Sequence, residues 1–156
     1  MIQRPQTVYL LAMLALLLMA AFAELPFYST QDESGTNKVT VHYGFTDIQA
    51  EDGQSRHQNT ALFSLLAVSA VIALIAILSF KNRKLQASMI AFNFGALMGI
   101  LGLMYMFSFY KAYFEHGSES LEIWVALPLF LLFFNYLALR GVRRDQQLIR
   151  SMDRFR

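Results

Sequence analysis

Four long apolar runs constrain this chain more than any other feature of its sequence. They cover residues 8–23, 60–80, 85–110 and about 121–139. A helix needs about 20 apolar residues to cross the hydrocarbon core of a bilayer. Only helices and closed barrels satisfy every backbone hydrogen bond in lipid, and so few segments cannot close a barrel. The sequence therefore predicts four transmembrane helices, at about residues 7–23, 60–80, 85–110 and 121–139.

The composition agrees with this prediction and leaves room for one domain. Hydrophobic residues make up 56% of the 156 residues and charged residues 15%, whereas a soluble domain carries about 25% charged residues. We therefore expect a single membrane domain over residues 1–156, an all-α four-transmembrane-helix bundle. The chain has no cysteine, which excludes disulfides, thiolate nucleophiles and cysteine metal ligands.

Basic residues are divided unequally between the loops, and this predicts the orientation. Cytoplasmic loops carry an excess of lysine and arginine. Of the 13 basic residues, all but Lys38, Arg56 and Lys111 fall on one side of the predicted spans, and most acidic residues fall on the other. We therefore expect both termini in the cytoplasm. The basic residues on that side are Arg4, Lys81, Arg83, Lys84, Arg140, Arg143, Arg144, Arg150, Arg154 and Arg156.

The first apolar run allows a second interpretation. A basic start, an apolar stretch and Ala21-Phe22-Ala23 before Glu24 also resemble a cleavable signal peptide. Cleavage would leave three spans in the same orientation. The distribution of charge therefore does not distinguish a cleaved signal peptide from a retained first span. We expect the first span to be retained.

The outer loop, residues 24–59, is the one segment between spans that is long enough to fold. Residues 38–45 alternate in polarity, which is typical of a strand, and nearby glycines can supply turns. We expect a short β-strand pair lying over the helix ends, and the alternative is an ordered loop without a sheet. The residues that share one face of this strand are Val39, Val41, Tyr43 and Phe45.

Small residues recur along the third predicted span. Ala87, Ala91, Gly95, Gly99 and Gly102 follow one another at about one helical turn. In lipid, small residues let helix backbones approach closely. This pattern predicts helix packing, either within the chain's own bundle or, alternatively, against another subunit.

Asn93 and Asn135 are the polar side chains placed most deeply in the predicted spans. Because an amide in hydrocarbon needs a hydrogen-bonding partner, we expect these intramembrane polar residues to clamp the third helix to the fourth, or to bond a nearby hydroxyl. A path for a polar solute is the alternative. No Asp, Glu, Lys, Arg or His lies in the interior of a predicted span, although ion-coupled transporters use such residues.

The residues that could carry chemistry match no known motif. His42, His57 and His116 fall outside the predicted spans, and their spacing fits no pattern of metal ligands. The chain has no Gly-x-Ser-x-Gly motif, and no histidine lies at the depth of the serines in the spans. We therefore predict no catalytic residue, no metal site and no cofactor, and we expect a protein that is not an enzyme.

The last residues form a basic tail. We expect the fourth helix to continue past Arg140 for a turn or more, and the chain then to lie along the anionic inner leaflet as an amphipathic helix. A simple topology anchor and a docking segment for a protein partner are the alternatives. Nucleic acid is not expected as a partner, since the tail lacks a series of stacking aromatic residues. The residues assigned to leaflet contact are Arg140, Arg143, Arg144, Arg150, Arg154 and Arg156.

Three polar segments resemble a known family. They read Ile2-Gln-Arg-Pro-Gln-Thr-Val-Tyr-Leu-Leu11, Phe80-Lys-Asn-Arg-Lys-Leu-Gln86 and Asp145-Gln-Gln-Leu-Ile-Arg-Ser-Met-Asp-Arg-Phe-Arg156. Together they are similar to four-helix membrane proteins of Bacteroidota catalogued as a domain of unknown function, family number four-two-nine-three. Pro5 stands where that family has an aliphatic residue, which a helix N-terminus tolerates. The resemblance covers the whole chain and implies a protein of a Gram-negative inner membrane, with residues 24–59 in the periplasm and no activity to transfer.

These observations favour a non-enzymatic accessory or scaffolding subunit that acts through contacts with membrane proteins or with itself. The alternative is a small carrier or channel for a neutral or lipid-like solute. A cavity between the helices lined by Asn93 or Asn135 would favour the carrier, and a tightly packed bundle would favour the accessory subunit.

Overall fold

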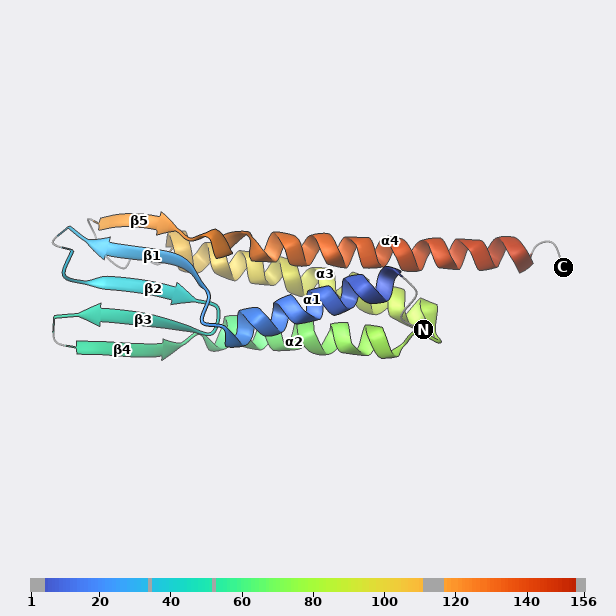
Figure 1. Cartoon of the computed structure of the whole chain (residues 1–156), viewed down its shortest axis with the longest axis horizontal. Coiled ribbons are helices and arrows are strands. Elements are labelled where there is room, and N and C mark those ends of the chain that lie inside the picture. Colours follow the sequence, from blue (N-terminus) through green and yellow to red (C-terminus); the bar gives the residue numbers. More distant parts are fainter. Residues whose placement is uncertain (1–4, 34, 52, 111–116, 154–156) are drawn as a thin grey trace.

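The computed structural model describes residues 5–33, 35–51, 53–110 and 117–153. Four long helices lie side by side, and a β-sheet continues from one end of them (Figure 1). A short π-helix, Met106–Tyr110, extends the third helix, and a 3-10 turn, Ile123–Ala126, precedes the fourth. The helices are α1 (Pro5–Phe22), α2 (Thr60–Leu78), α3 (Arg83–Tyr105) and α4 (Leu127–Asp153).

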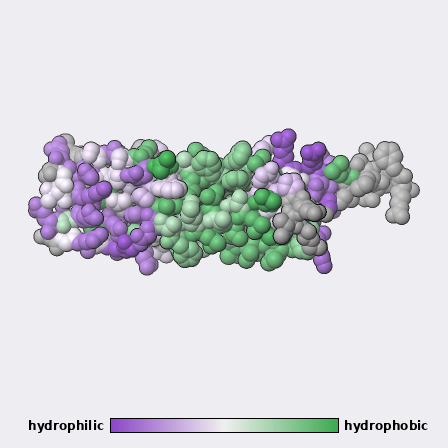
Figure 2. Space-filling model, viewed as in Figure 1, coloured by the Kyte–Doolittle hydropathy of each residue, from purple (hydrophilic) through white to green (hydrophobic). Residues whose placement is uncertain are grey.

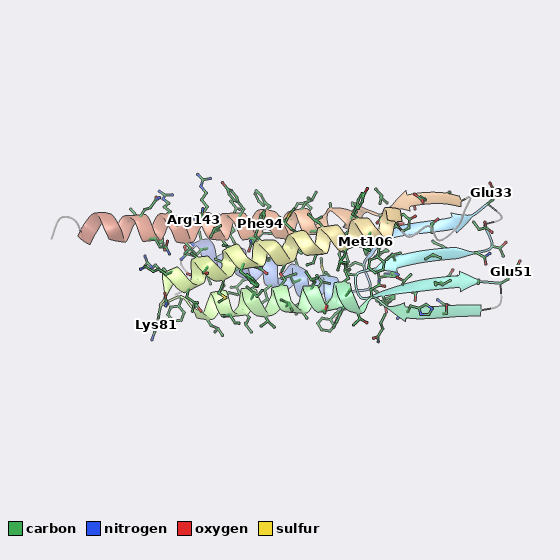
Figure 3. All side chains as sticks on the ribbon, turned by 180° about the vertical axis from the view of Figure 1, so that it is seen from behind. Glu33, Glu51, Lys81, Phe94, Met106 and Arg143 are labelled. Carbon is green, nitrogen blue, oxygen red and sulfur yellow. The ribbon has the colours of Figure 1, made fainter. Side chains whose placement is uncertain are left out.

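Each helix packs against two others, so that the bundle is a closed ring. α1 lies against α2, α2 against α3, α3 against α4, and α4 against α1. We call the end that carries the sheet the sheet end and the other the basic end. α1 starts and α4 ends at the basic end (Figure 1). Figure 3 shows Lys81 and Arg143 near the basic end and Glu33 and Glu51 at the far end of the sheet.

The outward surfaces of the helices are apolar. Val71 on α2, Phe92 on α3 and Leu129 on α4 are each more than half exposed, and Figure 2 shows a hydrophobic band between two hydrophilic ends. A helix of a soluble bundle would carry a polar outward face. All four helices in the described part of the chain are long and apolar enough to cross a membrane. The prediction of four such helices is therefore confirmed.

The sheet has five strands, all antiparallel, in the order β4-β3-β2-β1-β5. β5 (Gly117–Leu121) comes from the connection between α3 and α4, and it pairs with β1. The sheet is thus assembled from both connections at this end of the bundle. The strands between α1 and α2 are β1 (Pro26–Asp32), β2 (Lys38–His42), β3 (Phe45–Ala50) and β4 (Gly53–Gln58).

The prediction of an all-α fold with at most a short strand pair is therefore wrong. Only β2 has the alternation of a half-buried strand, with Val39 and Val41 buried. β4 is exposed along its whole length and β5 is polar, so neither carries an apolar pattern. β1 is buried at four successive positions, residues 27–30, so it does not alternate between buried and exposed residues as a half-buried strand does. These strands form because their backbones pair with strands beside them.

Buried aromatic residues join the sheet to the bundle. The ring of Phe27 packs against that of Tyr43, with 5.1 Å between centroids. The Tyr43 hydroxyl donates a hydrogen bond to the carbonyl oxygen of Trp124 over 2.7 Å. Burial raises the pKa of Tyr43 above its usual range, so this hydroxyl stays protonated and remains a donor.

Asn59, directly before α2, makes a second connection to the sheet. Its buried side chain accepts a hydrogen bond from the Thr46 hydroxyl over 3.0 Å and donates one to the His42 carbonyl over 2.9 Å. Its backbone N–H donates to the carbonyl oxygen of Gly44 over 3.0 Å. The start of α2 is therefore fixed to both β2 and β3.

We expect Asn59→Ala to lower the free energy of unfolding by about 1–3 kcal/mol, because the Thr46 hydroxyl and His42 carbonyl lose this buried partner. The chain's single tryptophan, Trp124, lies at the same junction. Its fluorescence during thermal unfolding in detergent measures the change. The exposed neighbour Gln58→Ala is the control, and equal melting temperatures for the two variants would contradict the role of Asn59.

Candidate functional site

Polar side chains from three helices meet at the basic end of the bundle. Gln6 lies in the first turn of α1, Arg83 begins α3, and Asp145 and Gln146 lie on α4. They belong to the three polar segments on which the family resemblance rests. Segments that are far apart in the sequence therefore come together at one place.

Three hydrogen bonds connect these side chains. Nε2 of Gln6 donates to Oδ2 of Asp145 over 3.2 Å, and Nη1 of Arg83 donates to the carbonyl oxygen of Asp145 over 3.0 Å. Nε2 of Gln146 donates to the carbonyl oxygen of Arg83 over 2.7 Å. Gln6 is only 2% exposed although it lies at a helix end. α1 and α3 are thereby both fixed to the same turn of α4.

Gly141 lets α1 approach α4 closely. A Cβ at this position would lie 3.1 Å from the Cβ of Gln6 and 3.3 Å from its Oε1. A larger side chain would push the first turn of α1 away and would displace the amide that donates to Asp145.

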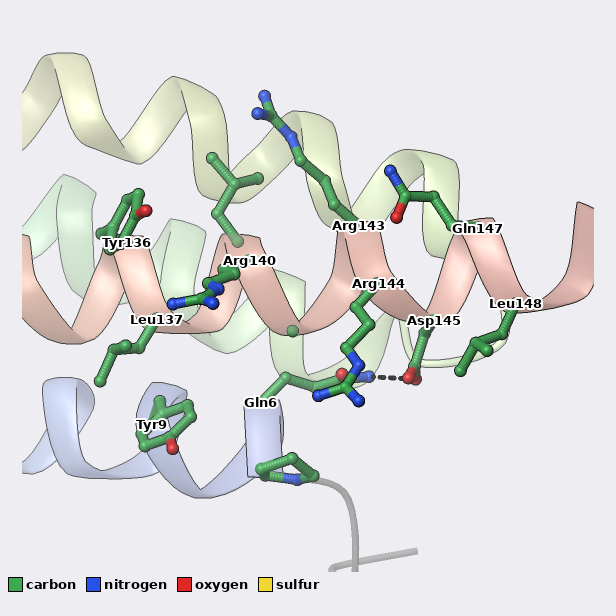
Figure 4. Close-up of a pocket in the computed structure, with 13 residues that line it drawn as sticks. Gln6, Tyr9, Tyr136, Leu137, Arg140, Arg143, Arg144, Asp145, Gln147 and Leu148 are labelled. Atoms are coloured by element: carbon green, nitrogen blue, oxygen red, sulfur yellow. Dashed lines mark hydrogen bonds between the residues drawn. The ribbon is translucent and has the colours of Figure 1, made fainter.

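A groove with a volume of about 860 Å³ lies between α1 and α4 beside this contact. Tyr9 of α1 and Tyr136 of α4 line it, together with three arginines of α4. Figure 4 shows Arg144 extending from α4 toward the side on which α1 lies. A groove of this size can hold a ligand of small-molecule dimensions.

The groove carries positive charge. Its lining contains Arg140, Arg143 and Arg144 against one carboxylate, that of Asp145, and three minus one leaves two net positive charges. Within the described part of the chain, none of these three guanidinium groups makes an ion pair or hydrogen bond with the protein. The groove therefore combines uncompensated donors with a partly apolar wall.

The two predicted intramembrane amides meet inside the bundle. Nδ2 of Asn93 lies 3.5 Å from Oδ1 of Asn135 and 3.8 Å from Sδ of Met13. Nδ2 of Asn135 donates to the carbonyl oxygen of Ile90 over 3.1 Å. Asn93 is 1% exposed and Asn135 is fully buried. These contacts join α3 to α4 and also reach α1.

The five small residues of the third predicted span lie in two kinds of environment. Gly99 faces α2, where a Cβ would lie 2.9 Å from a leucine methyl group, and Ala87 packs against the core. Gly95 and Gly102 have no atom within 4 Å of such a Cβ, and Ala91 is exposed. For these outward positions, packing against a second subunit stays a prediction.

The two described histidines, His42 and His57, lie on the sheet, apart from the groove. His42 stacks on Phe45 with 4.5 Å between centroids, and its Nδ1 lies 2.8 Å from the carbonyl oxygen of Glu24. His57 is exposed on β4, and His116 is outside the described residues. In the described ranges, no group of three or more His, Cys, Asp or Glu side chains could hold a metal ion.

The basic tail continues α4 as one unbroken helix to Asp153 (Figure 1). The helix thus continues past Arg140, as expected, and the described residues show no change of direction before Asp153 (Figure 1). Contact of this segment with the anionic leaflet stays a prediction. Hydrogen bonds to α1 and α3 hold this part of α4 along the bundle axis, and no proline follows Arg140 to end the helix. The arginines whose side chains lie outside the described part are Arg150, Arg154 and Arg156.

A second charged cluster lies on the sheet. Arg56 on β4 donates to both carboxylate oxygens of Asp47 on β3, over 2.8 and 3.2 Å, and to Glu24 over 3.1 Å. Its guanidinium carbon lies 4.0 Å from the centroid of the Phe45 ring. The hydrogen bonds to Asp47, and then to Glu24, raise the pKa of Arg56. Its positive charge is therefore compensated within the sheet.

Reasoning from the sequence missed the residues that place the arginines in a groove. Gln6, Tyr9 and Gly141 act through contacts between α1 and α4, which the pattern of a single helix cannot reveal. The available signals were positional: a glutamine in the first turn of an apolar helix, and a glycine just after the fourth apolar run.

We expect Gly141→Leu to lower the free energy of unfolding by about 1–3 kcal/mol, because the new side chain overpacks the contact between Gln6 and α4. Gly95→Leu is the matched control, since it makes the same change where a Cβ meets open space. Thermal unfolding of both variants in detergent gives the comparison. If both melted at the wild-type temperature, the close approach at Gly141 would not contribute to stability.

No curated protein matches this chain. A family model does match, over residues 2–155, and this range includes every helix and strand that the structure describes. The domain of unknown function inferred from the three polar segments is therefore confirmed, and an origin in Bacteroidota stays a prediction. The chain belongs to the family described as Domain of unknown function (DUF4293).

Proposed function

We propose that this protein crosses the cell inner membrane four times, with the basic end in the cytoplasm and the sheet in the periplasm. The apolar band supports the placement: α2 has 19 residues, which extend about 28 Å, close to the hydrocarbon thickness of about 30 Å. The separation of charge supports the orientation. The basic residues around the start of α3 and in the last part of α4 lie at the end opposite the sheet, as Figure 3 shows for Lys81 and Arg143.

Single cysteines test this orientation. With an impermeant thiol reagent on intact spheroplasts, Ser118→Cys on β5 should be labelled, and Ser151→Cys near the end of α4 should be labelled only after lysis. The chain has no cysteine of its own, so the wild-type protein is a clean background. Labelling of the Ser151 variant alone in intact spheroplasts would reverse the orientation.

We further propose that the protein is a non-enzymatic accessory or scaffolding subunit that contacts membrane proteins through its sheet. The observation that carries this proposal is the open edge at β4, which is exposed at every position. Edge strands offer unpaired backbone groups to another strand, and charges usually guard them. The charge on this edge, that of Arg56, is compensated by Asp47 and Glu24.

The alternative is a small carrier or channel for a neutral or lipid-like solute. Three buried oxygens without a hydrogen-bonding partner in the described bundle favour it, because water or solute could bond them. However, Asn93 and Asn135 are buried against each other and against Met13, and this packing supports the accessory role better. The three oxygens are Oγ of Ser69, Oε1 of Gln86 and Oδ1 of Asn93.

A photoreactive residue tests the accessory role. Placed at Ser55 on β4, it should form discrete adducts of higher mass in intact cells, because a protein partner or a second copy lies against that edge. The control position is Val71 on α2, which is exposed in the apolar band and should meet lipid. If Ser55 gave no adduct, or the same ones as Val71, contact through the sheet edge would be refuted.

A further inference from the structure

We infer that the groove between α1 and α4 binds the phosphate headgroup of an anionic phospholipid. The inference rests on the proposed position of the basic end in the inner leaflet. It assigns a ligand to the groove, which is separate from the sheet edge proposed to contact other membrane proteins. Four features of the groove support it: charge, donor geometry, depth and an apolar wall.

The charge and its spacing fit a phosphate group. Arg140 and Arg144 are four residues apart on α4, so they share one face, about 6 Å apart along the axis. Neither guanidinium has a hydrogen bond or ion pair within the described residues. The one carboxylate of the lining, that of Asp145, already accepts a hydrogen bond from Gln6. Guanidinium groups bind phosphate oxygens through paired N–H donors.

The tyrosines place this site at the depth of lipid headgroups. Tyr9 and Tyr136 both line the groove, and Tyr136 is 55% exposed. Tyrosines at a membrane surface keep the ring in the apolar region and the hydroxyl near water. Arg140 lies one helical turn beyond Tyr136, about 6 Å further from the band. Figure 2 shows the hydrophobic band giving way to hydrophilic side chains at this end of the bundle.

The apolar wall separates a phospholipid from a soluble anion. Leu137 and Leu139 line the same groove as the arginines. A free phosphate ion would use the guanidinium groups but would leave these leucines in contact with water. A phospholipid satisfies both parts, since its phosphate meets the arginines and the start of an acyl chain lies along the leucines.

Thermal unfolding of the full-length protein in detergent micelles tests the assignment. Phosphatidylglycerol should raise the melting temperature in proportion to its occupancy. Phosphatidylcholine and inorganic phosphate at the same concentrations should not. A rise of equal size with inorganic phosphate would overturn the assignment and would make the groove a site for soluble anions.

Two double variants separate the groove from the general surface charge. Arg140→Gln/Arg144→Gln should weaken the apparent affinity for phosphatidylglycerol by about tenfold or more. Lys81→Gln/Lys84→Gln removes the same charge from exposed positions of the same end that do not line the groove, and it should respond as wild type does. Without lipid, the arginine variant should melt at the wild-type temperature, because these side chains have no described protein partner.

If both double variants lost the rise in melting temperature with phosphatidylglycerol to the same extent, diffuse surface charge would explain the effect of the lipid. That result would overturn the assignment of a headgroup site in the groove. This outcome is distinguishable from failure of the proposed function. The lipid titrations in micelles depend neither on the orientation of the protein in a membrane nor on the edge of the sheet. If the lipid response is selective but crosslinking at Ser55 fails, only the accessory role is refuted.

Discussion

Hydrogen bonds fix the geometry of the helix bundle, because the apolar surfaces of its helices carry no directional bonds of their own. Inside the bundle, Asn93 and Asn135 join α3 to α4, and the other directional contacts lie at its two ends. Asn59 and Tyr43 set the position of the sheet against the helices. Gln6 and Arg83 set the positions of α1 and α3 against α4. Both the open strand edge and the groove depend on these contacts.

The helices could be predicted because a long apolar run can be recognised within one continuous segment of the sequence, without knowledge of what that segment contacts. The spans expected at 60–80 and 85–110 match α2 and α3 with its π-helical extension to within a few residues. The fourth helix was expected to continue past Arg140, and it does so to Asp153. The start of its span was placed too early, since Leu121 ends β5 and Ile123–Ala126 form a 3-10 turn. Arginine and glutamine are good helix formers, so the end of an apolar run does not end a helix.

The sheet and the groove were not predicted because they arise from contacts between distant segments. β5 is too polar to be recognised alone and forms because β1 is beside it. Within the outer loop, the sequence Asp52-Gly53 was a usable hairpin signal, and the strands before and after it, β3 and β4, pair antiparallel. The arginines of the groove were identified from the sequence, but as contacts along a surface. Their grouping depends on Gly141, which admits Gln6.

Elements near the start of the chain pair with elements near its end, and this affects the order in which the protein can fold during synthesis. Gln6 and its partner Asp145 are 139 residues apart, and Ser29 and its partner Ser120 are 91 residues apart. During synthesis, α1 and β1 are made long before the segments that bind them, and closing such large loops is slow. A nascent chain that lacks β5 and α4 therefore exposes an unpaired edge of β1 and an unanchored first helix. A protease or chaperone that recognises either feature distinguishes unfinished chains from finished ones.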